Sequence, residues 1–91
     1  MKVFFKQASC QLDFLKGPSG KYAVINEVFV PPKYRGKGLA TALIHNAIEI
    51  ARKKGCYKVL CWSRFSNGIA HGLYKKTGFK KWGYEYRLDL S

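Results

Sequence analysis

The spacing of apolar residues changes from a strand-like to a helix-like pattern between residues 21–30 and residues 39–54. The first stretch is rich in β-branched and aromatic residues and partly alternates, which predicts a strand. In the second stretch apolar residues recur every three or four positions, which predicts an amphipathic helix. Its apolar positions are Leu39, Ala40, Leu43, Ile44, Ala47, Ile48 and Ala51. Three basic residues followed by Gly55 favour a helix end at about Lys54.

Weaker patterns predict the remaining elements. Further strands are expected at residues 2–5, 10–15, 57–63, 80–82 and 84–90. A Gly-Pro-Ser-Gly turn at residues 17–20 precedes the main strand. A second helix is expected to begin after Ser66-Asn67, which can cap it, and to end between Lys76 and Gly78.

The order of these elements is β-β-β-α-β-α-β, with the last strand in two short pieces, and this order is typical of an α+β fold. The first three strands lie close together in sequence, so we expect an antiparallel meander. Residues 57–63 should run parallel to residues 21–30, because a helix joins the two strands. The prediction is a mixed, largely antiparallel sheet with two helices, in one domain spanning residues 1–91.

The charge of the chain narrows the class of partner. Its 91 residues include 17 Lys and Arg but only 5 Asp and Glu, a formal net charge of +12. This balance favours polyanions, among them nucleic acids, acidic proteins and multiply charged cofactors. A hydrophobic content of 47% allows a packed core and excludes a wholly disordered chain.

Cysteine usage and the N-terminus indicate a cytoplasmic protein. Cys10, Cys56 and Cys61 are odd in number and lack the spacing of metal ligands, so we expect free thiols in a reducing compartment and no metal. The first residues contain neither a long apolar run nor a cleavage signature. We therefore expect neither export nor a membrane partner.

A glycine-containing loop between the main strand and the first helix is the strongest functional signal. Gly36 and Gly38 allow positive φ and a close approach of backbone to ligand. The first N–H groups of the following helix attract negative charge, and Lys33, Arg35 and Lys37 add cations. A phosphate or pyrophosphate fits these features. The alternative is an ordinary tight strand-to-helix turn with solvated lysines.

The glycine spacing separates this loop from two common phosphate loops. Position 41 is Thr where the dinucleotide fingerprint needs Gly or Ala, and Lys37 is followed by Gly where nucleotide hydrolases need Ser or Thr. The run 35–40 instead reads Arg-x-x-Gly-x-Ala, after Val30-x-Pro32. This run resembles the acyl-CoA-binding motif of the GNAT superfamily of N-acyltransferases.

A second segment carries the same resemblance. Residues 67–79 read Asn-x-x-Ala-x-x-Leu-Tyr-x-x-x-Gly-Phe, which is similar at every defined position to another GNAT signature. The two motifs come in the family's order and each falls on the expected element. The resemblance implies the family's sheet, which splays between the strand ending near Val30 and the strand beginning near Tyr57.

The resemblance also implies roles for particular residues. The pantetheine arm of coenzyme A would lie against the backbone of Phe29 and Val30, and Asn67 would bind it further along. Tyr74 would protonate the leaving thiolate. The pyrophosphate would lie on the backbone amides of Arg35, Gly36, Lys37, Gly38, Leu39, Ala40 and Thr41. Asn67 can alternatively be a helix cap only, and Tyr74 a core aromatic at helical spacing.

The attacking amine must lose a proton, so a general base or a water chain is expected. Glu27 is the main candidate, since it lies three residues before Val30 on the strand that lines the family's cleft; an exposed, lysine-paired Glu is the alternative. His45 and His71 are weaker candidates with surface positions. Cys61 would need a neighbouring base to act as a nucleophile, and a buried structural thiol is the alternative.

Only about twenty residues precede the main strand, so we expect the family's usual N-terminal strand and helices, which cover the acceptor side, to be absent or much reduced. An open acceptor side would suit a macromolecular substrate, a homodimer whose partner closes it, or a member with little activity. The sequence therefore predicts an N-acetyltransferase that transfers acetyl directly from acetyl-CoA to an amine, without a metal. The acceptor is expected on a macromolecule such as a protein, with a small-molecule amine as the other option, because a charge of +12 repels a polycation. The alternative is a non-catalytic basic module of the same fold that binds nucleic acid or coenzyme A.

Overall fold

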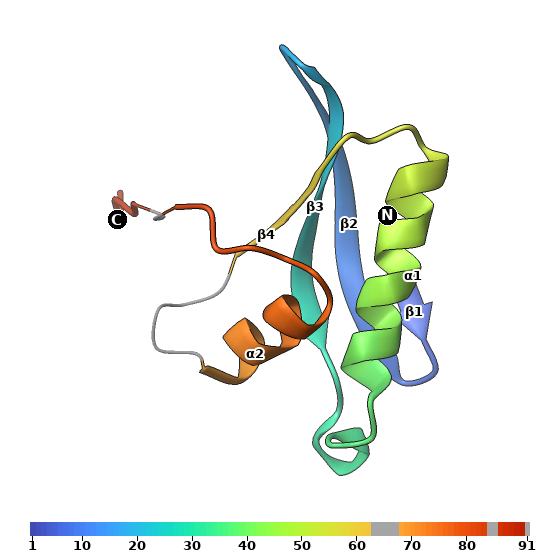
Figure 1. Cartoon of the computed structure of the whole chain (residues 1–91). Helices are drawn as coiled ribbons and strands as arrows, with labels where there is room; N and C mark the ends of the chain where they lie inside the picture. Colours follow the sequence, from blue (N-terminus) through green and yellow to red (C-terminus); the bar gives the residue numbers. More distant parts are fainter. Residues whose placement is uncertain (63–67, 84–85, 91) are drawn as a thin grey trace. The chain divides into compact units, whose positions relative to one another are not determined.

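The computed structural model describes residues 1–62, 68–83 and 86–90 of the chain (Figure 1). These residues form two compact units, Met1–Cys61 and Trp62–Ser91. No helix in the described ranges has the length and apolar character needed to span a membrane.

The first unit contains a four-stranded sheet in the order β1-β2-β3-β4. The strands are β1 (Lys2–Phe5), β2 (Ala8–Gly17), β3 (Gly20–Phe29) and β4 (Val59–Cys61). The first three pair antiparallel, and β4 pairs parallel to β3 over three residues. This confirms the predicted meander and the parallel fourth strand, although β4 is shorter than the predicted range and position 63 lies outside the described residues.

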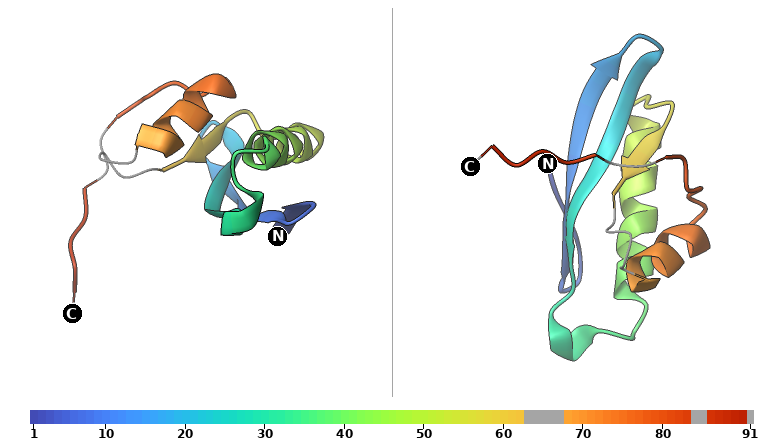
Figure 2. Two further views of the ribbon diagram at one scale, coloured as in Figure 1. Left: turned by 90° about the horizontal axis from the view of Figure 1, so that it is seen from below. Right: turned by 90° about the vertical axis from the view of Figure 1, so that its left-hand side faces the viewer.

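One face of this sheet is covered by α1 (Leu39–Lys53), as Figure 2 shows. The helix buries five residues at helical spacing, which gives it one apolar face. Buried residues of the sheet, Val3, Cys10, Leu12, Ala23 and Ile25, form the rest of the core with Leu43 and Ile44. The core therefore lies between α1 and the meander, and it fixes where the two ends of the helix lie.

The C-terminal end of α1 is a Schellman motif, as the sequence suggested. Gly55 has a φ of +80° and its N–H donates to the carbonyl of Arg52, while the N–H of Cys56 donates to the carbonyl of Ala51. Glycine tolerates this left-handed conformation without a Cβ penalty. The motif reverses the chain and leads it into β4.

The second unit contains α2 (Gly68–Lys76), which ends in the same way. Gly78 has a φ of +98°, its N–H donates to Lys75, and the N–H of Phe79 donates to Tyr74. The strands predicted at residues 80–82 and 84–90 were wrong wherever the structure describes them, since residues 80–83 and 86–90 contain no strand. Alternation permits a strand, but a strand forms only with a partner for its N–H and C=O groups, and these residues have none among the described strands.

A polar cluster spans the β2–β3 pair. The carboxylate of Asp13 accepts hydrogen bonds from Gln11 Nε2 and Asn26 Nδ2, each at 3.1 Å. The bond from Gln11, and then the one from Asn26, holds the pKa of Asp13 below its ordinary value. The folded state therefore favours the ionised carboxylate.

This cluster predicts a pH dependence of stability. The pKa of Asp13 is lower in the folded than in the unfolded chain. Its contribution to the free energy of unfolding is therefore present above the unfolded pKa and is lost as pH falls through the folded pKa. We expect Asp13→Asn to flatten the fall of the thermal midpoint between about pH 5 and pH 3. Thermal unfolding of both proteins across this range measures the effect, and parallel curves would contradict it.

Candidate functional site

The loop between β3 and α1 has a fixed shape. It begins with the 3₁₀ turn η1 (Pro32–Tyr34), in which the N–H groups of Tyr34 and Arg35 donate to the carbonyls of Pro31 and Pro32 at 2.9 and 3.3 Å. Gly36 and Gly38 then adopt φ values of +78° and +77°. Side chains other than glycine rarely adopt this conformation, so the glycines determine the path of the loop.

The N-terminal end of α1 is left without a side-chain cap. Its N-cap residue is Gly38, which has no side chain to accept a hydrogen bond from the first turn, and the first turn contains no acidic residue. The N–H of Ala42 already donates to the carbonyl of Gly38 at 3.2 Å. The N–H groups of Leu39, Ala40 and Thr41 precede the helical ladder and are available to an anion.

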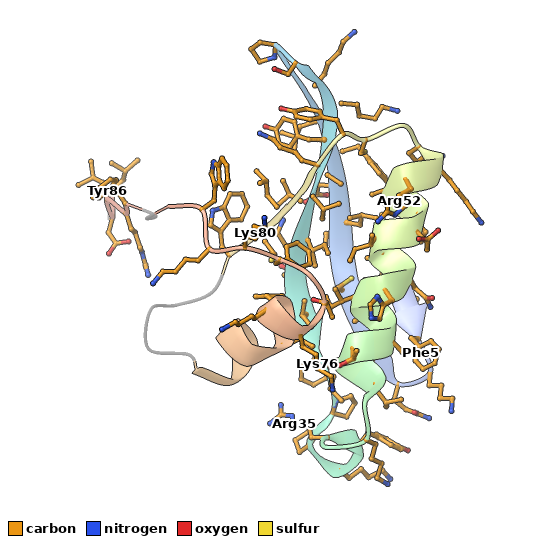
Figure 3. All side chains as sticks on the ribbon, viewed as in Figure 1. Phe5, Arg35, Arg52, Lys76, Lys80 and Tyr86 are labelled. Carbon is orange, nitrogen blue, oxygen red and sulfur yellow. The ribbon has the colours of Figure 1, made fainter. Side chains whose placement is uncertain are left out.

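Basic side chains surround this helix end. Lys33, Arg35 and Lys37 are all exposed, and residues 28–48 contain no Asp or Glu. Arg35 extends from the loop (Figure 3), and its Nε donates to the carbonyl of Val30 at 2.9 Å. This bond ties the loop to the end of β3. The N–H groups, the helix dipole and the cations all favour a multiply charged anion such as a pyrophosphate.

Next to the loop, β3 contains a bulge, and its described pairing with β4 stops before the loop. Ser9 pairs with Phe29 but Gln11 pairs with Asn26, so two residues of β3 face one of β2. Glu27 lies in this bulge with a φ of +54° and an exposed side chain. The pairing with β4 ends at Ile25, so the outer backbone edge of β3 beyond that pair is not taken up by β4. A left-handed non-glycine residue in a bulge is a feature found at functional sites.

These features agree with a match to a known family. The sequence model of the Acetyltransferase (GNAT) family matches residues 7–79. The chain belongs to this family. The match includes β2, β3, the glycine loop, α1, β4 and α2, so both sequence signatures fall within it.

Individual GNAT relatives support the same assignment. The chain is 46% identical over 66 residues to a glucosamine 6-phosphate N-acetyltransferase of Trypanosoma brucei brucei, covering 72% of this chain and 43% of the relative. It is 46% identical over 59 residues to an uncharacterized N-acetyltransferase of Methanocaldococcus jannaschii, covering 65% and 26%. The chain thus spans less than half the length of these two curated relatives.

Solved structures show the same fold. The crystal structure of a Trypanosoma brucei acetyltransferase superposes with a TM-score of 0.75 at 39% identity, covering 91% of this chain and 57% of that one. A predicted acetyltransferase of Clostridium acetobutylicum, solved with acetyl-CoA, has a TM-score of 0.76 at 22% identity and covers 91% and 56%. The second likeness is evidence for the GNAT fold alone.

The second GNAT signature has a clear local role in the helix stop of α2. Gly78 takes the left-handed position, and the Phe79 ring packs edge-to-face on Tyr74 with centroids 5.7 Å apart. A contact between these two positions is the usual companion of a Schellman motif. Thr77 Oγ1 donates to the carbonyls of Leu73 and Tyr74, each at 3.0 Å. The signature thus fixes the half-buried ring of Tyr74 at the last turn of α2.

The other candidate residues have mixed outcomes. Asn67 and the side chain of His71 lie outside the described residues, and His45 is exposed on α1. Burial raises the pKa of Cys61 to about 12, so this thiol would be a poor nucleophile at neutral pH. The described residues hold no group of three or more His, Cys, Asp or Glu that could bind a metal ion.

Sequence reasoning missed two features of this unit. They are the hydrogen bond from Arg35 to Val30 and the left-handed bulge at Glu27. Both depend on three-dimensional context, so no local sequence pattern predicts them. The chain has a second basic run, residues 52–54, away from this loop. The structure places it in the last turn of α1, about 22 Å along the helix from the glycine loop.

Proposed function

We propose that this chain binds acetyl-CoA and transfers its acetyl group directly to an amine. The observation that carries the proposal is the uncapped N-terminal end of α1 behind two left-handed glycines, surrounded by three exposed cations. The pyrophosphate of the cofactor matches this site in charge and in its demand for backbone donors. Membership of the GNAT family supports the same ligand.

The pantetheine arm is assigned to the outer edge of β3 beyond Ile25, where the described pairing with β4 has ended. The arm contains amide groups, which can hydrogen-bond to backbone in the way that an added strand does. Phe29 is 52% exposed next to this edge, and Val30 follows it. The carbonyl oxygen of Val30 already accepts a hydrogen bond from Arg35, so an amide of the arm would donate to the second lone pair of the same oxygen.

The reaction needs one base and one acid. The amine nitrogen attacks the thioester carbon, a tetrahedral intermediate forms, and the C–S bond then breaks. We assign the proton on the leaving sulfur to the hydroxyl of Tyr74, and removal of the amine proton to Glu27 or to a water that Glu27 holds. The exposure of Glu27 and the fixed ring of Tyr74 support these roles.

The acceptor is proposed to be an amine on a macromolecule. The names of relatives give unlike acceptors: one is a glucosamine 6-phosphate N-acetyltransferase and another a putative ribosomal-protein-alanine N-acetyltransferase. A net charge of +12 disfavours polycationic acceptors and favours an amine next to negative charge. An acceptor screen should therefore compare anionic sugars with protein amines bound in nucleoprotein complexes.

Thermal unfolding with and without acetyl-CoA tests the cofactor site. At a hundredfold excess over the dissociation constant, bound ligand adds about 2.7 kcal/mol, which should raise the midpoint by roughly 10–20 °C for a domain of this size. The experiment is done at raised salt to weaken nonspecific attraction.

ATP is the control in this experiment, because it carries phosphates and adenine without the pantetheine arm. A large shift with acetyl-CoA and a small one with ATP is expected. Equal small shifts would mean that the glycine loop is only a basic turn, and the proposed function would then fail.

A further inference from the structure

A second basic surface lies at the other end of the first unit. It is formed by the turn end of the β2–β3 hairpin, the last turn of α1 and the segment that enters β4, and we call it the hairpin pole. It comprises Lys21, Tyr22, Arg52, Lys53, Lys54, Tyr57 and Lys58. Arg52 stands at this end of α1 and Arg35 at the opposite end (Figure 3). The glycine loop does not explain the hairpin pole, because the full length of α1 separates the two.

Two tyrosine rings and one ammonium group are held together in the hairpin pole. Lys58 Nζ lies 5.1 Å from the ring centroid of Tyr22 and 5.2 Å from that of Tyr57. Gly17 leaves room for the Tyr22 ring, since a Cβ there would lie 3.3 Å from it, and Gly20 lies next to the Tyr57 ring, where a Cβ would make an ordinary contact at 3.7 Å. The N–H of Tyr57 donates to the carbonyl of Lys21 at 2.9 Å. This bond fixes the backbone of Tyr57 beside the hairpin, and Tyr57 is 53% exposed.

The hairpin pole has a large excess of positive charge. Lys21 Nζ donates to the carbonyl of Lys54 at 3.1 Å, which anchors the helix end to the hairpin. Arg52 pairs with Glu49 at 3.3 Å, and both side chains are mostly exposed. Residues 44–62 contain no acidic residue besides Glu49. Five cations against one carboxylate make an electrostatic footprint for a polyanion.

A small hollow opens between the last turns of α1 and the start of β4. Its volume is about 170 Å³, and its lining includes Ala51, Arg52, Cys56, Tyr57 and Lys58. One water occupies only about 30 Å³, whereas sites for drug-sized ligands start at about 300 Å³. The hollow is therefore large enough for one ring-sized group, and its lining includes one tyrosine and two cationic residues.

We propose that the hairpin pole binds single-stranded nucleic acid. Phosphates are bound by Lys53, Lys54 and the other cations, and one base enters the hollow against the ring of Tyr57. Proteins that bind single strands combine a basic track with aromatic rings on which bases stack. An acidic protein surface would match the charge but would have no use for the exposed ring and the hollow. This site is independent of acetyl transfer, since it shares no residue with the glycine loop.

The charge contribution is tested with a fluorescent single-stranded 12-mer, on the whole chain, by anisotropy over about 50–200 mM salt. Lys53→Gln with Lys54→Gln removes two phosphate contacts, so the slope of log K against log salt should fall in magnitude by about 1.4. The matched control is Lys33→Gln with Lys37→Gln at the glycine loop, which lowers the net charge equally. The control variant should keep the salt slope of the parent. Equal losses of slope in both double variants would show that binding follows net charge, and would overturn the hairpin pole as the site.

The ring contribution is tested at Tyr57. Tyr57→Ala should weaken binding of the 12-mer by about tenfold at constant salt and leave the slope unchanged, while Tyr57→Phe should bind like the parent. Circular dichroism checks that both variants fold. An unchanged affinity in a folded Tyr57→Ala protein would contradict base stacking.

Two competitors identify the class of ligand and its location. Poly-glutamate that displaces the 12-mer at equal charge concentration would overturn the nucleic-acid proposal in favour of an acidic protein partner. Saturating acetyl-CoA should not displace the 12-mer; displacement would place the binding at the glycine loop. Failure of the acetyl-CoA experiments alone leaves these outcomes unaffected.

Discussion

Replacing Tyr74 by Phe should slow acetyl transfer by about 10²-fold or more while leaving the affinity for acetyl-CoA nearly unchanged. The substitution removes only the hydroxyl, and Phe retains the edge-to-face packing on Phe79 that accompanies the end of α2. A leaving thiolate that receives no proton raises the barrier of the step in which the C–S bond breaks. The loss should therefore appear in kcat, with little change in stability.

The measurement pairs steady-state transfer to the best acceptor with calorimetric binding of acetyl-CoA. Tyr57→Phe is the matched control, because it also removes one tyrosine hydroxyl but lies in the first unit next to Gly20. It should transfer at the parent rate. Equal losses of binding and turnover in Tyr74→Phe would show that the hydroxyl helps to bind the cofactor, and the general-acid role would then be wrong.

The sequence predicted most of the first unit because its local signals agree with one another. The glycine at position 55 follows a basic helix end, and the structure has the left-handed stop that this order favours. The apolar positions 39, 43, 44, 47 and 51 are the ones that α1 buries. Strand pairing followed from chain order, since short connections give antiparallel neighbours and a helical crossover gives a parallel one.

The C-terminal strands were wrong for a physical reason. Residues 86–90 alternate apolar and polar side chains, but Tyr86, Leu88 and Leu90 are each more than four-fifths exposed. A period of two describes how a strand presents its side chains and does not provide the neighbour that the backbone needs. Sequence alone could not identify that neighbour.

The candidate site divides in the same way. The glycine loop was predictable, because positive φ and uncapped N–H groups are properties of a few consecutive residues. The hairpin pole was not, because Lys21-Tyr22 and Tyr57-Lys58 are two short basic-aromatic pairs that only the pairing of β3 with the segment before β4 brings together. Long-range pairing forms that surface. In the sequence, the two Lys-Tyr pairs are the feature that indicates it.

Gly38→Ala should weaken acetyl-CoA binding by about 10- to 100-fold, whereas Gly55→Ala should leave it unchanged. The two glycines are matched: their φ values are +77° and +80°, and a Cβ on either would meet no atom within 4 Å. Each substitution therefore costs about 1–2 kcal/mol of folding stability through backbone strain alone. The midpoint of unfolding should fall by a similar amount in both, about 4–8 °C for each kcal/mol.

Only Gly38 lies where the proposed pyrophosphate approaches the backbone. A Cβ at position 38 would occupy the space next to the backbone where the pyrophosphate is proposed to lie. Relaxation of the strained backbone would also turn the N–H groups of Leu39 and Ala40 away from the anion. Losing one hydrogen bond to a charged group costs about 1.5–3 kcal/mol, which corresponds to the expected fall in affinity. Calorimetry of both variants separates the two effects. Equal affinity in the two proteins would show that the end of α1 does not bind the cofactor, because the strain is common to both.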